Sequence, residues 1–247
     1  MAITLPTSKI PAETQDPKRL IIFSKPKTGK SSACAELPDA LCIDLENGGY
    51  SYINAMKVTI NSVKELKELC KAIMDAGKPY KFIVLDTISR LEDMVKPLAL
   101  KIFQETPAGS QFTGTDVLDA AHGAGYGALR KAIEMCIDMI AKCAPNIILV
   151  CHSKDAAVGS SDLTIKQISL TGKTGSILAS KSDAIGFMHR DENSNTILSF
   201  NTNDTSIEVG ARPAHLRNKE VVLGEMQPDG TIQYHWERIY PSLNSDK

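Results

Sequence analysis

Residues 20–32 read Leu-Ile-Ile-Phe-Ser-Lys-Pro-Lys-Thr-Gly-Lys-Ser-Ser. The apolar residues 20–23 predict a buried strand, and Gly29-Lys30-Ser31 predicts a loop end from which a helix starts. In this arrangement backbone N–H groups point at an anion, the lysine ammonium reaches the outer phosphates, and the serine hydroxyl can ligate Mg²⁺. The stretch therefore predicts a phosphate-binding loop, or P-loop.

The match to the P-loop pattern departs at one position, because Ser24 stands six residues before Lys30, where the pattern has Gly. Serine tolerates a positive φ less well than glycine, at a cost of about 1 kcal/mol if the turn demands one. The alternative is an ordinary strand–turn–helix unit with a surface lysine. The P-loop interpretation assigns the nucleotide contacts to Ser24, Lys25, Pro26, Lys27, Thr28, Gly29, Lys30, Ser31 and Ser32.

The composition suits one large α/β domain, or a core domain with a small appendage. The chain has 247 residues, of which 43% are hydrophobic and 23% charged. Its net charge of -1 means that any nucleic-acid binding must come from local loops. The six cysteines form no C-x-x-C pair, so we expect buried free thiols and a cytoplasmic location. No signal peptide or apolar run of about 18 residues is evident, so we expect a soluble protein without membrane contact.

Strand and helix patterns alternate as far as residue 151, and each strand is apolar on both faces. Such strands are typical of a mainly parallel sheet covered by helices. Short strands joined by turns follow, which predicts antiparallel strands at one edge. The predicted strands are 19–23, 40–45, 57–60, 81–86, 146–151, 184–188, 196–201, 206–209 and 231–236; the predicted helices start at Lys30 and cover 62–76, 88–104, 126–143 and 176–182.

The rest of the chain divides into an arm and two polar segments. Residues 1–17 contain Pro6, Pro11 and Pro17 and predict an N-terminal arm, which leaves 18–247 as one domain with a C-terminal β extension. Residues 105–123 and 153–175 are rich in Gly, Ser and Thr and predict mobile loops.

A metal site needs an acidic group near Ser31. Residues 82–86 are four apolar residues that end in Asp86, at the sheet edge where parallel strands present their ligands. Asp86 would hold Mg²⁺ near Ser31, directly or through water. The alternative is that Asp86 only caps the following helix.

Hydrolysis also needs a group that orients or deprotonates the attacking water. Residues 42–46 read Cys-Ile-Asp-Leu-Glu and place Glu46 at the same edge, so Glu46 is the predicted general base. Asp44 is the second candidate, and Glu46 could instead belong only to the turn before Gly48. A fourth strand ends in His152, which is the candidate sensor of the γ-phosphate; a structural histidine is the alternative.

The order of these landmarks resembles the RecA-like ATPase core. The P-loop is followed by Cys-Ile-Asp-Leu-Glu, then Phe-Ile-Val-Leu-Asp-Thr-Ile-Ser-Arg-Leu, then Ile-Ile-Leu-Val-Cys-His-Ser-Lys-Asp. The chain is most similar to short phage proteins of single-strand annealing or recombination, over roughly residues 18–220. This resemblance implies a RecA-like α/β P-loop NTPase fold. It also implies that Glu46 and Lys30 act in catalysis, that Asp86 and Ser31 bind the metal, and that His152 replaces the usual sensor glutamine.

The resemblance further implies two loops that face single-stranded DNA. Residues 105–123 and 155–175 fit those loops, and Lys154, Lys166 and Lys173 are the candidate DNA contacts. A solvated loop is the alternative for the second segment. The basic turn at 210–217 resembles one in the family, so Arg212 or Arg217 would reach a neighbouring subunit's γ-phosphate as a finger in trans.

The resemblance thus implies a Mg²⁺-dependent ATPase in the cytoplasm of a phage host, which acts on single-stranded DNA. Its implied partners are further copies of the chain, head-to-tail in a ring or filament, and a single-strand DNA-binding protein. The open alternatives are a non-catalytic nucleotide-binding assembly module and a helicase-type DNA motor core. ATP is inferred from the family alone. Tyr50, Tyr52 and Trp236 are the aromatic candidates for adenine stacking, and Trp236 fits the core better.

Overall fold

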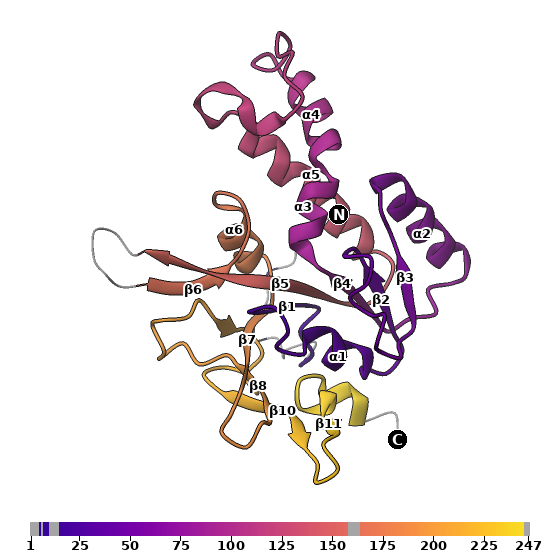
Figure 1. Ribbon diagram of the computed structural model, residues 1–247, viewed down its shortest axis with the longest axis vertical. Helices are drawn as coiled ribbons and strands as arrows, with labels where there is room; N and C mark the ends of the chain where they lie inside the picture. The colour runs from indigo at the N-terminus through magenta and orange to yellow at the C-terminus, as the bar shows by residue number, and fades with distance from the viewer. Residues whose placement is uncertain (1–4, 6, 10–14, 158–163, 245–247) are drawn as a thin grey trace.

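A computed structural model of the chain describes residues 5, 7–9, 15–157 and 164–244. The described residues form a sheet of eleven strands with helices on both faces (Figure 1). Its main path runs β11-β10-β8-β7-β1-β5-β4-β2-β3, so the P-loop strand β1 lies in the middle. The predicted α/β fold class is confirmed.

The six strands from β7 to β3 are parallel and form the core of the sheet. They are β7 (Ala184–Arg190), β1 (Arg19–Ser24), β5 (Asn146–Ala157), β4 (Phe82–Asp86), β2 (Ala40–Asp44) and β3 (Lys57–Thr59). Ser24 pairs with His152 across β1 and β5, and Asp44 pairs with Asp86 across β2 and β4. This register brings four chain segments to one edge of the sheet.

The side chains of the central strands alternate between two apolar layers. Ile21 and Phe23 belong to one cluster, whereas Leu20 and Ile22 belong to the other, and all are buried. The first layer is covered by α2 (Val63–Asp75), α3 (Ile88–Met94), α4 (Lys96–Gln104), α5 (Gly125–Ile140) and α6 (Thr174–Ser180). The second is covered by α1 (Lys30–Ala35) and by the C-terminal residues that include Trp236 and Tyr240. Burial on both faces explains the continuous apolar strands.

The C-terminal part continues the sheet with antiparallel strands, as predicted. These strands are β8 (Thr196–Ser199), β10 (Glu220–Met226) and β11 (Ile232–Tyr234), and the short β9 (Gly210–Ala211) pairs with the start of β7. The prediction of a strand at 206–209 was wrong, because only Ile207 forms an isolated bridge, to Lys166. β10 was not predicted.

Two predictions about the segments above the sheet need correction. The helix predicted over 88–104 is divided at Val95 into α3 and α4, and Pro97 lies in the first turn of α4, where its missing N–H is tolerated. Residues 105–123 are not a loop throughout, since they contain the 3₁₀ helices η1 (Val117–Asp119) and η2 (Ala121–Gly123). Figure 1 shows this region rising with α4 and α5 away from the sheet.

The polar segment after His152 contains two paired strands, which we call the hairpin, so the prediction of a loop was wrong for residues 153–157 and 164–168. β5 continues to Ala157 and pairs with the antiparallel β6 (Thr164–Ile168). The hairpin extends to the left of the sheet in Figure 1. One continuous strand therefore joins the sheet edge at His152 to this hairpin.

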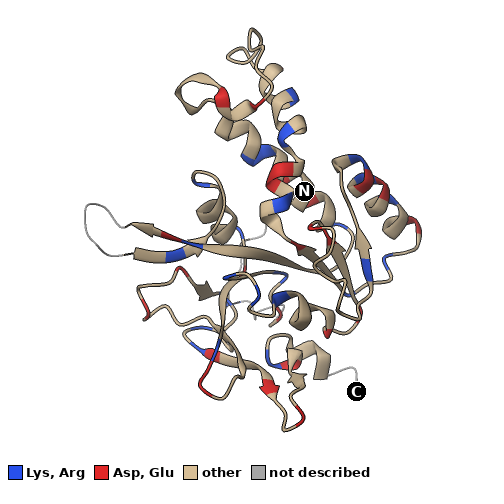
Figure 2. Cartoon of the chain, viewed as in Figure 1, with Lys and Arg blue, Asp and Glu red and all other residues tan. Residues whose placement is uncertain are grey.

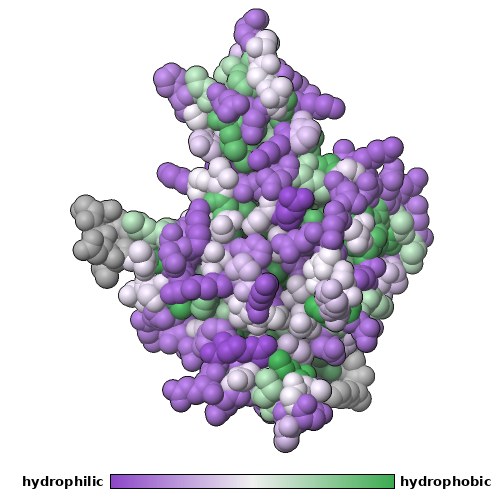
Figure 3. All heavy atoms as spheres, viewed as in Figure 1, coloured by the Kyte–Doolittle hydropathy of each residue, from purple (hydrophilic) through white to green (hydrophobic). Residues whose placement is uncertain are grey.

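Most of the predicted arm, at residues 1–4, 6 and 10–14, lies outside the described residues. Its last part is attached to the domain, since Pro17 is buried and Asp16 accepts hydrogen bonds from the backbone and hydroxyl of Ser242, at the 3₁₀ helix η4 (Pro241–Asn244). All six cysteines are free and buried, as predicted. Hydrophilic side chains cover most of the face seen in Figure 3. None of the helices in the described part of the chain combines the length and the apolar character of a membrane span.

Candidate functional site

The predicted P-loop lies between β1 and α1 at the carboxyl edge of the sheet. β1 ends at Ser24, and α1 begins at Lys30, directly after Gly29. The loop reverses through positive φ angles at Lys27 (63°) and Gly29 (103°). Ser24 is not among the positions with positive φ, so its replacement of glycine causes no backbone strain here.

Oxygen atoms of the loop hold the Lys30 side chain. Its Nζ donates to Ser24 Oγ at 2.9 Å and to the Lys25 carbonyl at 3.0 Å, and the side chain lies 6% exposed. Thr28 Oγ1 donates to the same Lys25 carbonyl at 2.8 Å and fixes the loop. A buried ammonium with neutral acceptors gains strongly from an anionic partner.

Ser31 and Asp86, the two residues predicted to bind the metal, are in direct contact. Ser31 Oγ donates to Asp86 Oδ2 at 2.6 Å, and the Tyr50 hydroxyl donates to the same oxygen at 3.1 Å. Hydroxyl and carboxylate oxygens suit Mg²⁺, which in nucleotide sites takes one or two carboxylates plus phosphates and water. The described residues contain no group of three or more His, Cys, Asp or Glu that could hold a metal alone. The donor set therefore fits a Mg²⁺ ion whose coordination a polyphosphate completes.

Glu46 follows β2 and faces the same edge. Its Oε1 accepts from Thr87 Oγ1 at 3.1 Å and lies 3.1 Å from His152 Nε2. Asp44, the other candidate base, accepts the backbone N–H of Glu46 at 2.9 Å and that of Gly48 at 3.2 Å. Asp44 thus shapes the turn, and Glu46 is the carboxylate that the turn presents.

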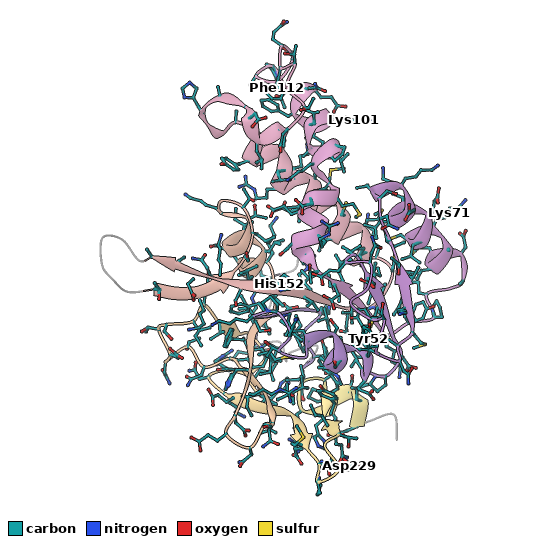
Figure 4. The ribbon with its side chains drawn as sticks, viewed as in Figure 1. Tyr52, Lys71, Lys101, Phe112, His152 and Asp229 are labelled. Atoms are coloured by element: carbon teal, nitrogen blue, oxygen red, sulfur yellow. The ribbon has the colours of Figure 1, made fainter. Side chains whose placement is uncertain are left out.

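These groups surround one cavity of about 430 Å³. It is lined by Pro26, Lys27, Gly29, Lys30, Ser31, Ser32, Glu46, Gly49, Ile53, Asp86, Thr87 and His152. Figure 4 labels His152, which lies on β5 near the centre of the view. A larger hollow of about 600 Å³ borders α2 and α4, but its lining includes none of the predicted site residues. The predicted site residues therefore gather at the smaller cavity.

Burial shifts the two central charges of the site toward their neutral forms. The pKa of Lys30 is lowered because burial disfavours its ammonium, against the attraction of Asp86. The pKa of Asp86 is raised because burial disfavours its carboxylate, and the hydrogen bonds from Ser31 and Tyr50 reduce this effect. A bound phosphate would stabilise the charged form of Lys30, and a bound cation would stabilise the charged form of Asp86. Without such ligands, both charges are destabilised by burial.

We expect Asp86→Asn to stabilise the protein in the absence of ligand. The folded pKa of Asp86 lies above its unfolded value, so between pH ~4 and that raised pKa the folded state binds more protons than the unfolded state. Stability of the unaltered protein therefore falls as pH rises through this window. The Tm difference between variant and unaltered protein should grow across the window and then stay constant; each ~1 kcal/mol shifts Tm by roughly 2–4 °C.

Thermal unfolding at several pH values measures this difference, with Asp93→Asn, on the outer part of α3, as the control. Added Mg²⁺ and nucleotide should stabilise the unaltered protein more than Asp86→Asn. A variant that melts lower at every pH would contradict the electrostatic account.

The three lysines predicted to contact DNA lie on or after the hairpin. Lys154 is on β5 and donates to the Leu170 carbonyl at 2.6 Å, Lys166 is on β6, and Lys173 precedes α6. Figure 2 shows one acidic residue beside the basic ones on the described part of this hairpin, and this residue is Asp155 of β5. None of the three lines the P-loop cavity, although Lys154 and His152 border a neighbouring open hollow.

Arg212 and Arg217 lie at the opposite edge of the sheet from the P-loop. Arg212 contacts Asp183 at 3.4 Å and the Ser180 carbonyl at 2.8 Å, next to the start of β7. Arg217 donates to the Arg212 carbonyl at 2.8 Å. Because β7 and β1 are parallel, neither arginine can reach the P-loop of its own chain.

Sequence reasoning missed the site roles of Tyr50 and Thr87. Tyr50 is buried and its hydroxyl donates to Asp86, whereas Thr87 donates to Glu46. The sequence could have indicated these roles through the places of the two residues in the chain. Thr87 directly follows a strand end, and Tyr50 follows the turn that contains Glu46. Trp236 is in the core, as predicted, and donates to the Ala33 carbonyl at 2.8 Å; Tyr52 is fully exposed.

The chain was compared with protein-family models, curated proteins and solved structures. A family model described as "AAA domain" matches residues 16–222. Among solved structures, a KaiC-like protein from the hyperthermophilic archaeon Pyrococcus horikoshii OT3 is similar, with a TM-score of 0.48, 11% identity and 90% of each chain covered. No curated protein matches the chain. The family match covers the P-loop and every strand of the parallel core, and the chain therefore belongs to the AAA domain family of P-loop NTPases.

Proposed function

We propose that this protein is a Mg²⁺-dependent ATPase that acts on single-stranded DNA. The observation that carries the ATPase part is the single cavity that joins the P-loop, the Ser31–Asp86 pair and the Glu46 carboxylate. One group to bind phosphate, one to bind Mg²⁺ and one to activate water are the parts that phosphoryl transfer to water needs.

In this proposal the P-loop residues bind and orient the triphosphate. Lys30 exchanges its neutral acceptors, Ser24 Oγ and the Lys25 carbonyl, for phosphate oxygens. Ser31 and Asp86 hold Mg²⁺, which when bound neutralises phosphate charge. The buried, low-dielectric site strengthens each of these interactions.

Glu46 acts as the general base in this proposal. Its carboxylate accepts a proton from the attacking water as the water oxygen bonds to phosphorus and the phosphorus–oxygen bond to ADP breaks. Thr87 and His152 both contact Oε1, which fixes the carboxylate against the cavity. A change at the γ-phosphate would reach β5 through His152, as the sensor assignment requires.

The proposed DNA function is annealing or strand exchange in phage recombination. Support comes from the continuity of β5, which carries both His152 and, two residues later, Lys154 at the base of the hairpin. Lys166 and Lys173 would add phosphate contacts. Arg212 and Arg217 lie at the opposite edge of the sheet from their own P-loop, so in this proposal they act in trans, at the site of a head-to-tail neighbour.

A steady-state ATPase assay with and without single-stranded DNA tests this proposal. We expect Mg²⁺-dependent turnover that DNA stimulates and that Lys154→Ala combined with Lys166→Ala reduces. ATP binding without turnover in either condition would favour a nucleotide-binding assembly module. Directional unwinding of a duplex would favour a motor. An ATPase rate that is the same with and without single-stranded DNA would contradict the proposed DNA function but not the proposed ATPase.

A further inference from the structure

Arg190 is the last residue of β7, which lies beside β1 on the side away from β5. Phe187 pairs with Phe23, so Arg190, three residues later, is level with the first residues of the P-loop. This arginine therefore lies at the same edge of the sheet as the P-loop. Arg212, in contrast, contacts Asp183, just before the start of β7.

The Arg190 guanidinium lies against the P-loop. Its Nη2 is 3.0 Å from the position that a Cβ would occupy on Gly29, so the guanidinium lies directly beside the P-loop backbone. Its Nη1 donates to the Ser194 carbonyl at 2.9 Å, which anchors the side chain. Arg19, Arg90, Arg212 and Arg238 each pair with a carboxylate, whereas Arg190, like Arg130 and Arg217, forms no ion pair in the described part of the chain.

The sheet order indicates which part of a nucleotide Arg190 would meet. Asp86 ends β4, Glu46 follows β2 and His152 is on β5, and these three strands all lie on one side of β1. A triphosphate whose γ-phosphate lies among them has its nucleoside end on the other side, toward β7. Building on the proposed nucleotide site, we propose that Arg190 binds the α-phosphate of a nucleotide in the same subunit.

This position has a specific consequence for affinity and rate. A guanidinium offers several N–H donors in a planar fork that matches phosphate oxygens. A contact at the α-phosphate is the same in the ATP and ADP complexes and does not change as the γ-phosphate leaves. It therefore strengthens binding of both nucleotides without accelerating the chemical step.

Equilibrium titration of Arg190→Ala with ADP and with a non-hydrolysable ATP analogue tests the inference. We expect affinity for both to fall by the same factor, roughly tenfold or about 1.4 kcal/mol, with kcat at saturating ATP unchanged. Arg190→Lys should recover part of the affinity. Arg130→Ala, on α5, removes an arginine away from the P-loop and should leave both affinities unchanged.

The outcomes separate this inference from the proposed ATPase. Unchanged affinities in Arg190→Ala would overturn this inference but not the proposed ATPase. A loss confined to the affinity for the ATP analogue, or to kcat, would also overturn it, because such a loss would place the arginine at the γ-phosphate. Absence of binding by the unaltered protein would overturn the nucleotide site itself. If Arg190→Ala melts at a lower temperature, Arg190→Gln, which retains most of the side chain, gives the same comparison.

Discussion

Lys30→Ala should lose affinity for ATP by roughly a hundredfold or more while it keeps the fold. The Lys30 ammonium lies at the P-loop cavity with two neutral acceptors within 3.0 Å, and phosphate oxygens would replace them. Hydrogen bonds to charged groups contribute about 1.5–3 kcal/mol each, and every ~1.4 kcal/mol is tenfold in affinity. Two such bonds account for the expected loss.

The fold should tolerate this change because Lys30 is an unfavourable residue in the absence of ligand. Burial lowers the pKa of Lys30, so its removal relieves a desolvation cost. Ser24 Oγ, which loses one partner, still donates to the Lys25 carbonyl at 3.1 Å. A variant with unaltered stability and no nucleotide affinity would show that the residue serves binding.

Isothermal titration with ATP and Mg²⁺, together with thermal unfolding, measures both quantities. Lys64→Ala is a matched control, since this exposed lysine of α2 only forms a surface pair with Glu68. ATP affinity that survives in Lys30→Ala would refute the P-loop assignment. If Lys30→Ala is less stable, Lys30→Met, which keeps the apolar stem, separates the loss of charge from the loss of packing.

The core of this site could be predicted from the sequence because its signals are local. A P-loop is one continuous stretch, and parallel strands present their carboxyl ends at the same edge. The contact between Ser31 and Asp86 follows from those two rules, although the residues are far apart in the chain. The same rules predicted Glu46 and His152 at this edge of the sheet, where their side chains lie 3.1 Å apart.

The parts that could not be predicted depend on strand pairing between distant segments. The hairpin of β5 and β6 has a loop-like composition, and only pairs such as Ser153 with Ile168 make it a strand. The position of β7 beside β1 is also invisible in a single sequence, and with it the approach of Arg190 to Gly29. Polar strands and the order of the sheet are therefore where the sequence signal is weakest.

Glu46→Gln should retain ATP binding and lose hydrolysis by roughly 10²–10⁴-fold, the usual contribution of a general base. Glutamine has the shape of glutamate, and its side-chain oxygen can still accept from Thr87. Its amide cannot take a proton from water, so only the chemical step is removed. Phosphate release under saturating Mg²⁺ and ATP measures the rate, and titration with a non-hydrolysable analogue measures binding.

Glu68→Gln on α2 is the control, because this carboxylate is exposed and distant from the P-loop cavity. Hydrolysis that persists in Glu46→Gln would move the base to another group, and Asp44 is the next candidate. The geometry argues against Asp44, since its two oxygens accept the N–H groups of Glu46 and Gly48 and shape the turn. Asp44→Asn should therefore lower thermal stability. If this variant instead kept its stability and lost turnover, Asp44 would be the general base and Glu46 would not.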